Sequence, residues 1–223
     1  MTESFLGLKK KRILLVDDHP LLRQGISQLI DQQDDLVTCG EAEDRAGALR
    51  ALDQLHPDLA IVDLSLKEER GLELIRDAKA LHPQVPMLVL SMHDEQFYAE
   101  RALRAGARGY IMKREASDKV LEAIRVVLEG CVYVSGSVGR SIVDKIAGES
   151  ESRTKSRWGK LSDREMDVFL LIGKGYGSQQ IAKRLTISVK TVETHRANIK
   201  IKLQLNSGEE LLQQAIGCAQ EFG

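Results

Sequence analysis

Cysteine and long apolar runs are scarce in this chain, and their scarcity excludes several protein classes. The three cysteines, at positions 39, 131 and 218, are odd in number and far apart, so neither a disulfide framework nor a C-x-x-C redox or zinc motif is expected. No apolar stretch approaches the roughly 20 residues that a membrane-spanning helix needs. The basic residues 9–12 follow the first apolar residues, which is not the order of a signal peptide. These features predict a cytoplasmic protein with reduced thiols and no membrane partner.

Apolar runs alternate with helix-periodic segments in the first half of the chain. Short buried strands read as near-continuous apolar runs, and parallel strands need helical crossovers between them. Five such runs and five such crossovers precede about residue 130, which predicts an α/β fold with a doubly wound five-stranded parallel sheet. The five runs are residues 13–16, 36–39, 59–62, 87–91 and 109–112.

Chemically active residues stand where these runs end. Asp17 and Asp18 follow the first run, Asp63 the third and Lys113 the fifth, and Ser91 ends the fourth. Open α/β sheets bind ligands at the carboxyl ends of their strands, so we expect these groups to gather there. Three carboxylates beside a lysine and a hydroxyl favour a divalent cation and a phosphoryl group. Because like charges repel, at least one carboxyl group is expected to have a raised pKa in the absence of metal.

The net charge of −1 hides an uneven distribution of charge along the chain. Residues 153–203 hold twelve Lys or Arg and four Asp or Glu, a charge of +8, so the remaining residues carry −9. A basic block on an acidic chain indicates nucleic-acid binding, although a solvated basic surface explains the charge alone equally well. The polar segment 148–157, which lacks apolar residues, is typical of a tether between domains.

Helix-capping signals follow the tether. Two short helices joined by a tight turn, the second of them polar and basic, describe a helix-turn-helix, here in an all-α domain of four helices. The first and fourth helices are expected to begin with capping boxes, and the second and third with serine caps. The pairs Ser162/Glu165 and Ser207/Glu210 provide the boxes, and Ser178 and Ser188 the caps.

The third of these helices has the features of a DNA-reading helix. Helical periodicity turns Val192, Ile199 and Leu203 inward and leaves the polar positions outward. Glu193, Thr194 and Ala197 are then expected to contact the edges of the bases. The basic side chains of this helix are expected to contact DNA phosphates; they are Lys190, Arg196, Lys200 and Lys202. The full set of expected DNA contacts is Lys190, Thr191, Glu193, Thr194, Arg196, Ala197 and Lys200.

Together these motifs resemble a known family over nearly the whole chain. Residues 12–130 are similar to a bacterial response-regulator receiver domain, which is flavodoxin-like, and residues 160–220 to a LuxR-type helix-turn-helix. The chain therefore resembles a NarL/FixJ-type response regulator, with a receiver over 1–130 (core from about 11), a linker with a short helix over 131–159 and a DNA-binding domain over 160–223. The motifs are Ile13-Leu-Leu-Val-Asp-Asp-His19, Ala60-Ile-Val-Asp-Leu64, Leu90-Ser91, Ala105-Gly-Ala-Arg-Gly-Tyr-Ile-Met-Lys113, Leu161-Ser-Asp-Arg-Glu165, Gln180-Ile-Ala182 and Thr191-Val-Glu-Thr-His195.

The resemblance implies a role for each motif residue. Asp63 is expected to accept a phosphoryl group from a phosphohistidine of a sensor histidine kinase, and Lys113 to pair with its oxygens. Ser91 and Tyr110 are expected to act as switch residues, with Tyr110 turning inward on phosphorylation. The expected Mg²⁺ ligands are Asp17, Asp18, Asp63 and the backbone carbonyl of Ser65.

The function implied is a transcription regulator that is switched by phosphorylation and binds double-stranded DNA as a homodimer, with RNA polymerase as a further partner. The only catalysis expected is self-phosphorylation and autodephosphorylation at Asp63. The alternative is a DNA-binding regulator whose receiver serves only for dimerisation or ligand sensing.

The sequence departs from the family pattern in two places. Lys67 stands where a proline is common after the phosphoacceptor, and Gly177-Ser-Gln-Gln180 replaces the commoner Ser-Asn-Lys-Glu.

Overall fold

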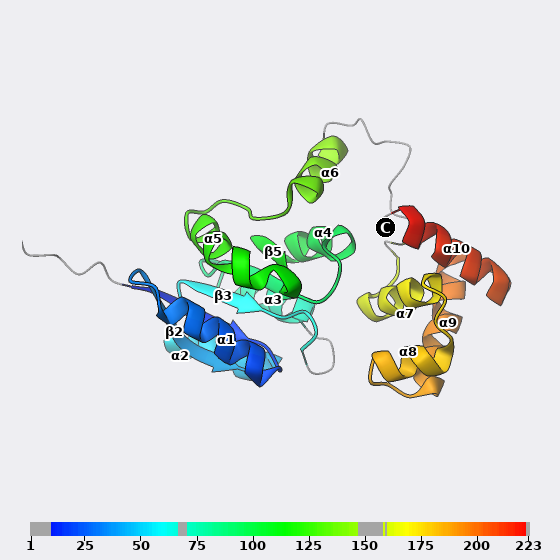
Figure 1. Ribbon diagram of the computed structural model, residues 1–223, viewed down its shortest axis with the longest axis horizontal. Coiled ribbons are helices and arrows are strands. Elements are labelled where there is room, and N and C mark those ends of the chain that lie inside the picture. Colours follow the sequence, from blue (N-terminus) through cyan, green and yellow to red (C-terminus); the bar gives the residue numbers. More distant parts are fainter. Residues whose placement is uncertain (1–9, 67–70, 147–157, 159, 222–223) are drawn as a thin grey trace, which may run out of the picture. The chain divides into compact units, whose positions relative to one another are not determined.

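The chain forms two compact units, Met1–Val143 and Asp144–Gly223, in the computed structural model. The structure describes residues 10–66, 71–146, 158 and 160–221 (Figure 1). The division falls within the predicted linker at 131–159, and Lys67 lies outside the described residues. Within the described part of the chain, no helix is both long enough and apolar enough to cross a membrane.

The first unit contains the predicted parallel sheet, with strands in the order β2-β1-β3-β4-β5. All four neighbouring pairs are parallel, and the pairing of β1 with β2 shifts register between Ile13 and Leu14. The chain order reverses at β1, which lies between β2 and β3, so the predicted doubly wound topology is confirmed. The strands are β1 (Lys11–Val16), β2 (Leu36–Ala42), β3 (Leu59–Val62), β4 (Met87–Ser91) and β5 (Gly109–Met112).

Helices connect the strands and begin at recognisable signals. Pro20 opens the first of them, and the side chain of Asp44 caps the second by accepting a hydrogen bond from the backbone N–H of Gly47 at 2.7 Å. The crossover helices are α1 (Pro20–Asp31), α2 (Arg45–Leu55), α3 (Gly71–Leu81) and α4 (Glu95–Ala105), and the short 3₁₀ helix η2 (Lys113–Glu115) leads into α5 (Ala116–Leu128).

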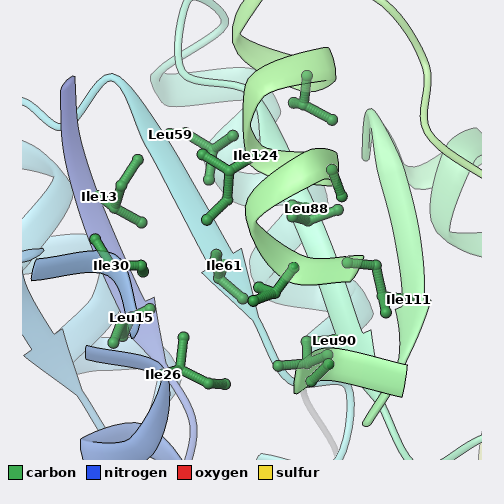
Figure 2. Packing of buried hydrophobic residues seen from close by; sticks show 14 of the residues in the cluster. Ile13, Leu15, Ile26, Ile30, Leu59, Ile61, Leu88, Leu90, Ile111 and Ile124 are labelled. Atoms are coloured by element: carbon green, nitrogen blue, oxygen red, sulfur yellow. The ribbon is translucent and has the colours of Figure 1, made fainter. Parts of the chain in front are cut away.

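One layer of the core lies between the sheet and the helices α1 and α5. Figure 2 shows Ile26 and Ile30 of α1 and Ile124 of α5 packed over the strands. Alternate residues along the strands face this layer, because successive side chains of a strand point to opposite faces. These strand residues are Ile13, Leu15, Leu59, Ile61, Leu88, Leu90 and Ile111, all at most 3% exposed.

Part of the predicted linker is attached to the sheet. Tyr133 forms a parallel bridge with Gly109 of β5. Its carbonyl accepts from the backbone N–H of Tyr110 at 2.8 Å, and its own N–H donates to the carbonyl of Arg108 at 3.0 Å. The helix that follows, α6 (Gly136–Ile146), is the short helix expected in this segment.

The second unit has the predicted four helices, and most of the predicted caps are present. Ser162 and Glu165 form the capping box, and the hydroxyl of Ser188 accepts from the backbone N–H of Thr191. The predicted cap at Ser178 is wrong by one position: Gly177 is the N-cap, and its N–H donates to the side chain of Gln180 at 3.1 Å. The helices are α7 (Asp163–Gly173), α8 (Ser178–Arg184), α9 (Val189–Leu203) and α10 (Gly208–Glu221).

Candidate metal centre and nucleic-acid interface

The sheet topology brings two aspartates together at the carboxyl ends of β1 and β3. Val16 and Val62 are register partners in these neighbouring strands, and Asp17 and Asp63 follow them directly. The backbone N–H of Asp63 donates to the carbonyl of Val16 at 2.8 Å, which fixes the two strand ends to one another. Both residues are buried, with Asp17 5% and Asp63 1% exposed.

Lys113 joins the two carboxylates. Its ammonium nitrogen lies 2.7 Å from Asp63 Oδ2 and 2.8 Å from Asp17 Oδ2, and its side chain is only 5% exposed. Lys113 follows β5, two strands away from β3, so only the folded sheet can place it here. Two buried negative charges thus share one buried positive charge, which leaves the pocket one charge short of neutrality.

The donor set around this pair fits a hard divalent cation. Ligand atoms of Asp17, Asp18, His19 and Asp63 all lie within 4.8 Å of one another. Asp18 Oδ1 is buried and accepts no hydrogen bond from the described residues, although His19 Nδ1 lies 2.8 Å away. A buried carboxylate oxygen without a donor is costly, and a metal ion would satisfy it.

The loop after β3 holds the Asp63 side chain. The backbone N–H of Ser65 donates to Asp63 Oδ1 at 3.0 Å. Gly71, at the start of α3, lies so close that an added Cβ would stand 2.4 Å from Leu64 Cα and 2.6 Å from the Asp63 carbonyl oxygen. Glycine is therefore required where α3 meets this loop. The expected metal contact of the Ser65 carbonyl stays a prediction.

Burial raises the pKa of Asp63 above its ordinary value. The Lys113 ammonium, by its charge and its hydrogen bond, and the N–H of Ser65 act in the opposite direction. The charge of Asp17 also raises the pKa, but it is the smallest of these causes. The direction agrees with the expected raised carboxyl pKa, but burial is its largest cause and repulsion by Asp17 only the smallest.

The two predicted switch residues lie in one buried network. Ser91 is fully buried at the end of β4, and its hydroxyl accepts from the backbone N–H of His93 at 3.2 Å. Tyr110 is 1% exposed, and its hydroxyl donates to the carbonyl of His93 at 2.9 Å. Burial raises the pKa of Tyr110, and a hydrogen bond with Ser91 opposes this. The Tyr110 ring thus lies inside the fold, and its expected inward turn on phosphorylation stays a prediction.

His93 belongs to this site although sequence reasoning missed it. Its Nε2 lies 3.1 Å from the hydroxyl of Ser65, and its ring stacks on that of Tyr98 with centroids 4.5 Å apart. His93 thus connects the loop that follows Asp63 with α4. Its only signal in the sequence was its position two residues after Ser91.

Helix α9 presents a polar face as predicted. Val192 and Ile199 are fully buried, whereas Glu193, Thr194 and Ala197 are exposed. Lys190 is also exposed, Thr191, Arg196 and Lys200 are half-buried, and the hydroxyls of Thr191 and Ser188 lie 2.8 Å apart within the helix cap.

Lys202, which was expected to contact a DNA phosphate, forms an ion pair within its own unit. Lys202 Nζ lies 2.6 Å from Oε2 of the buried Glu165, so this lysine holds α9 to the start of α7. The same carboxylate accepts from the backbone N–H of Ser162 at 2.7 Å. Arg164 supports the turn after α8 by donating to the carbonyl of Leu185 at 2.6 Å. The helix-turn-helix is thus fixed to α7 by charged contacts at two places.

Two family models match the chain. The response regulator receiver domain matches residues 13–125, and the bacterial regulatory proteins of the luxR family match residues 159–215.

The chain is also similar to individual proteins along most of its length. It is 35% identical over 209 residues to the oxygen regulatory protein NreC of Staphylococcus carnosus, covering 92% of this chain and 96% of NreC. A crystal structure of a LuxR-family two-component response regulator from Aurantimonas matches with a TM-score of 0.57 and 30% identity, over 62% of this chain and 99% of that one. The structure of RcsB from Salmonella enterica bound to promoter DNA with the phosphomimetic BeF3⁻ matches with a TM-score of 0.57 and 26% identity, over 92% of this chain and 98% of RcsB.

Proposed function

Because the chain belongs to the two-component response regulators that join a receiver domain to a LuxR-type DNA-binding domain, we propose that phosphorylation of Asp63 by a sensor histidine kinase controls its binding to DNA. The observation that carries the proposal is the pocket in which Asp17, Asp63 and Lys113 meet at the switch point of the sheet.

The pocket is suited to phosphoryl transfer onto Asp63. A carboxylate oxygen of Asp63 forms a bond to phosphorus while the bond from phosphorus to the kinase imidazole nitrogen breaks. Such transfer depends mainly on positioning and on neutralisation of charge. Lys113 and the N–H of Ser65 already hold the carboxylate in place, and Lys113 remains to pair with the new phosphoryl oxygens.

Asp17, Asp18 and Asp63, with the carbonyl of Ser65, would hold Mg²⁺. When bound, Mg²⁺ supplies positive charge against the phosphoryl oxygens. Asp18 Oδ1 supports this assignment, because it is buried and accepts no hydrogen bond from the described residues. The chain's own catalysis would then be limited to accepting the phosphoryl group and losing it again to water.

The switch would run through Ser91 and the buried ring of Tyr110. The phosphoryl group adds about −1.5 to −2 charges and strong hydrogen-bond acceptors beside the pocket. The Ser91 hydroxyl, which now interacts with His93 and Tyr110, would turn to donate to a phosphoryl oxygen. Tyr110 and His93 would then rearrange their hydrogen bonds, and the surface of α4 would change through the stacked ring of Tyr98.

The second unit would read DNA as a homodimer in the cytoplasm, with RNA polymerase as a further partner. A single helix-turn-helix covers few base pairs, so two copies on a two-fold site are needed for specificity. On α10, Leu211 and Ala215 are fully buried within their own unit, whereas Leu212 and Ile216 are 41% and 37% exposed. These two exposed residues are one turn apart and are available to a second copy. The solved RcsB dimers on DNA support this arrangement.

Mass spectrometry tests the proposal. Incubation of the full chain with acetyl phosphate and Mg²⁺ should add about 80 Da, the mass of one phosphoryl group, and should strengthen binding to a selected DNA duplex. Asp63→Asn should abolish both effects, because an amide is a poor nucleophile. Asp53→Asn, at a carboxylate that is 69% exposed, is the matched control. A label retained in Asp63→Asn would show that another residue is modified.

The same experiment separates the alternative function. A regulator whose receiver serves only for dimerisation or ligand sensing would bind DNA equally well with and without acetyl phosphate. The convergence of Asp17, Asp63 and Lys113 favours the phosphorylated regulator, because dimerisation alone does not require these residues to meet.

A further inference from the structure

The two helices of the helix-turn-helix are linked by a side-chain hydrogen bond at the DNA-reading face. Ser178, in the first turn of α8, donates from its hydroxyl to Glu193 Oε1 at 2.5 Å. Glu193 lies on α9 and was predicted to meet base edges. Its carboxylate is therefore held from outside its own helix, by a residue at one of the positions where the sequence departs from the family pattern.

The second oxygen of Glu193 remains available. Arg196 Nε stands 3.8 Å from Glu193 Oε2, which is an ion-pair distance but too long for a hydrogen bond. Oε2 accepts no hydrogen bond from the described residues, and the Glu193 side chain is 57% exposed. The carboxylate thus presents a single acceptor oxygen, with a guanidinium nearby that offsets its repulsion of DNA phosphates.

We infer that Glu193 reads cytosine at one position of each half-site, and that Ser178 is the positioning residue that makes this reading selective. The inference rests on the proposed DNA-binding function. In the major groove, cytosine offers an amino donor and no acceptor, which matches one free carboxylate oxygen.

The other bases fit this carboxylate less well. Guanine presents only acceptors at N7 and O6, and thymine presents O4 and a methyl group. Adenine has an amino donor, but its N7 acceptor stands beside it and repels a carboxylate. Glu193 therefore selects partly by exclusion, because its negative charge meets an acceptor atom of every base except cytosine.

The contribution of Ser178 follows from side-chain freedom. Without its hydroxyl, the Glu193 side chain can rotate toward Arg196 on its own helix and leave the groove. Discrimination at this position should then fall while contacts to the DNA backbone are kept. Loss of selectivity without an equal loss of total affinity is the signature that distinguishes positioning from a general structural role.

Selection from a pool of random-sequence DNA duplexes tests the inference. The full chain, treated with acetyl phosphate and Mg²⁺, is compared with Ser178→Ala, Ser178→Thr, Glu193→Ala and Glu193→Gln. The exposed neighbour Gln179→Ala is the matched control on α8. Bound duplexes are sequenced, and affinities for the selected site and for single-base variants are measured.

Each variant has its own expected outcome. Glu193→Ala should lower the preference for cytosine at one position by about tenfold, and Ser178→Ala by about threefold. The double variant should match Glu193→Ala, because Ser178 acts through Glu193. Ser178→Thr and Gln179→Ala should keep the preference. Glu193→Gln should shift it toward adenine, which pairs with an amide at N6 and N7.

Three failures are distinguishable. If no duplex is enriched by the parent chain, the proposed DNA-binding function itself fails. If duplexes are enriched but Ser178→Ala keeps the full preference, or if it weakens all sequences equally, the positioning role is overturned. A preference for guanine, thymine or adenine at the position affected by Glu193→Ala would overturn the assignment of cytosine.

Discussion

Replacement of Lys113 by methionine should destabilise the first unit strongly. Its ammonium group lies between Asp17 and Asp63 at 2.8 and 2.7 Å, and all three side chains are less than a tenth exposed. Removing one partner of a buried ion pair typically costs about 3–5 kcal/mol, because a buried charge is left uncompensated. Midpoints for domains of this size move by roughly 4 °C per kcal/mol, so a fall of about 15 °C is expected.

The pH dependence of this loss has a definite sign. Burial holds the pKa of Asp63 above its ordinary value, and Lys113 opposes that shift. Without Lys113 the pKa should rise further, so ionised Asp63 disfavours folding more. A carboxyl group with a raised folded pKa contributes stability below its unfolded pKa and loses it as pH rises through the folded pKa. The deficit of Lys113→Met should therefore shrink in acid and grow toward neutral pH.

Two optical signals distinguish the unfolding of the first unit from that of the second in this experiment. Far-UV circular dichroism follows both units, whereas Trp158, the single tryptophan of the chain, reports by fluorescence on the second. Lys113→Met should move only the transition of the first unit, and adding Asp63→Asn should recover part of the loss. Lys119→Met, whose partner Glu115 is one helical turn away, should leave the midpoint unchanged. A Lys113→Met midpoint within about 2 °C of the parent, or a deficit independent of pH, would refute the argument.

Three further predictions concern the metal centre, the loop and the DNA contacts. Above its dissociation constant, each tenfold rise in Mg²⁺ should stabilise the first unit by about 1.4 kcal/mol, and Asp18→Asn should shift the start of this rise to higher Mg²⁺ concentrations. A melting curve unmoved by millimolar Mg²⁺ would count against the site. Gly71→Ala should lower the free energy of unfolding by about 1–3 kcal/mol and slow phosphorylation by acetyl phosphate. Gly25→Ala should do neither, because a Cβ added there meets nothing within 4 Å. Equal melting midpoints of the two variants would contradict the close approach of Gly71 to the loop. Lys200→Ala should reduce the slope of log binding constant against log salt concentration by about 0.9 for each lost phosphate contact. Lys202→Ala should instead lower the thermal midpoint of the second unit, followed by Trp158 fluorescence, because Lys202 pairs with Glu165. Equal salt slopes for the two variants would show that Lys202 also contacts DNA.

The convergence of the pocket could be predicted from sequence because it follows from one rule. Asp17, Asp63 and Lys113 each follow a short apolar run, and parallel strands bring such positions to the same edge. Strand pairing has a period of two residues, so the buried runs leave little freedom in register. The inward face of α9 was predictable for a similar reason, since Val192 and Ile199 keep the helical period.

Contacts that depend on the packing of one element against another could not be predicted this way. The ion pair of Lys202 with Glu165 requires the crossing of α9 over α7, and the bond of Ser178 to Glu193 requires the angle within the helix-turn-helix. Periodicity places side chains on a face but does not give their rotamers, which is why the stacking of His93 on Tyr98 could not be predicted. The cap at Gly177 shows the same limit for helix ends, because adjacent residues can both begin a helix.

The backbone of Tyr133 closes one side of the sheet. An outermost strand normally presents unpaired N–H and C=O groups, which invite a strand of another molecule to pair with it. At β5 the N–H of Tyr110 and the carbonyl of Arg108 are already bonded to Tyr133. A strand of a second molecule could therefore pair with this part of β5 only by displacing Tyr133. The segment after α5 thus protects the protein against the edge-to-edge stacking of strands that leads to aggregates.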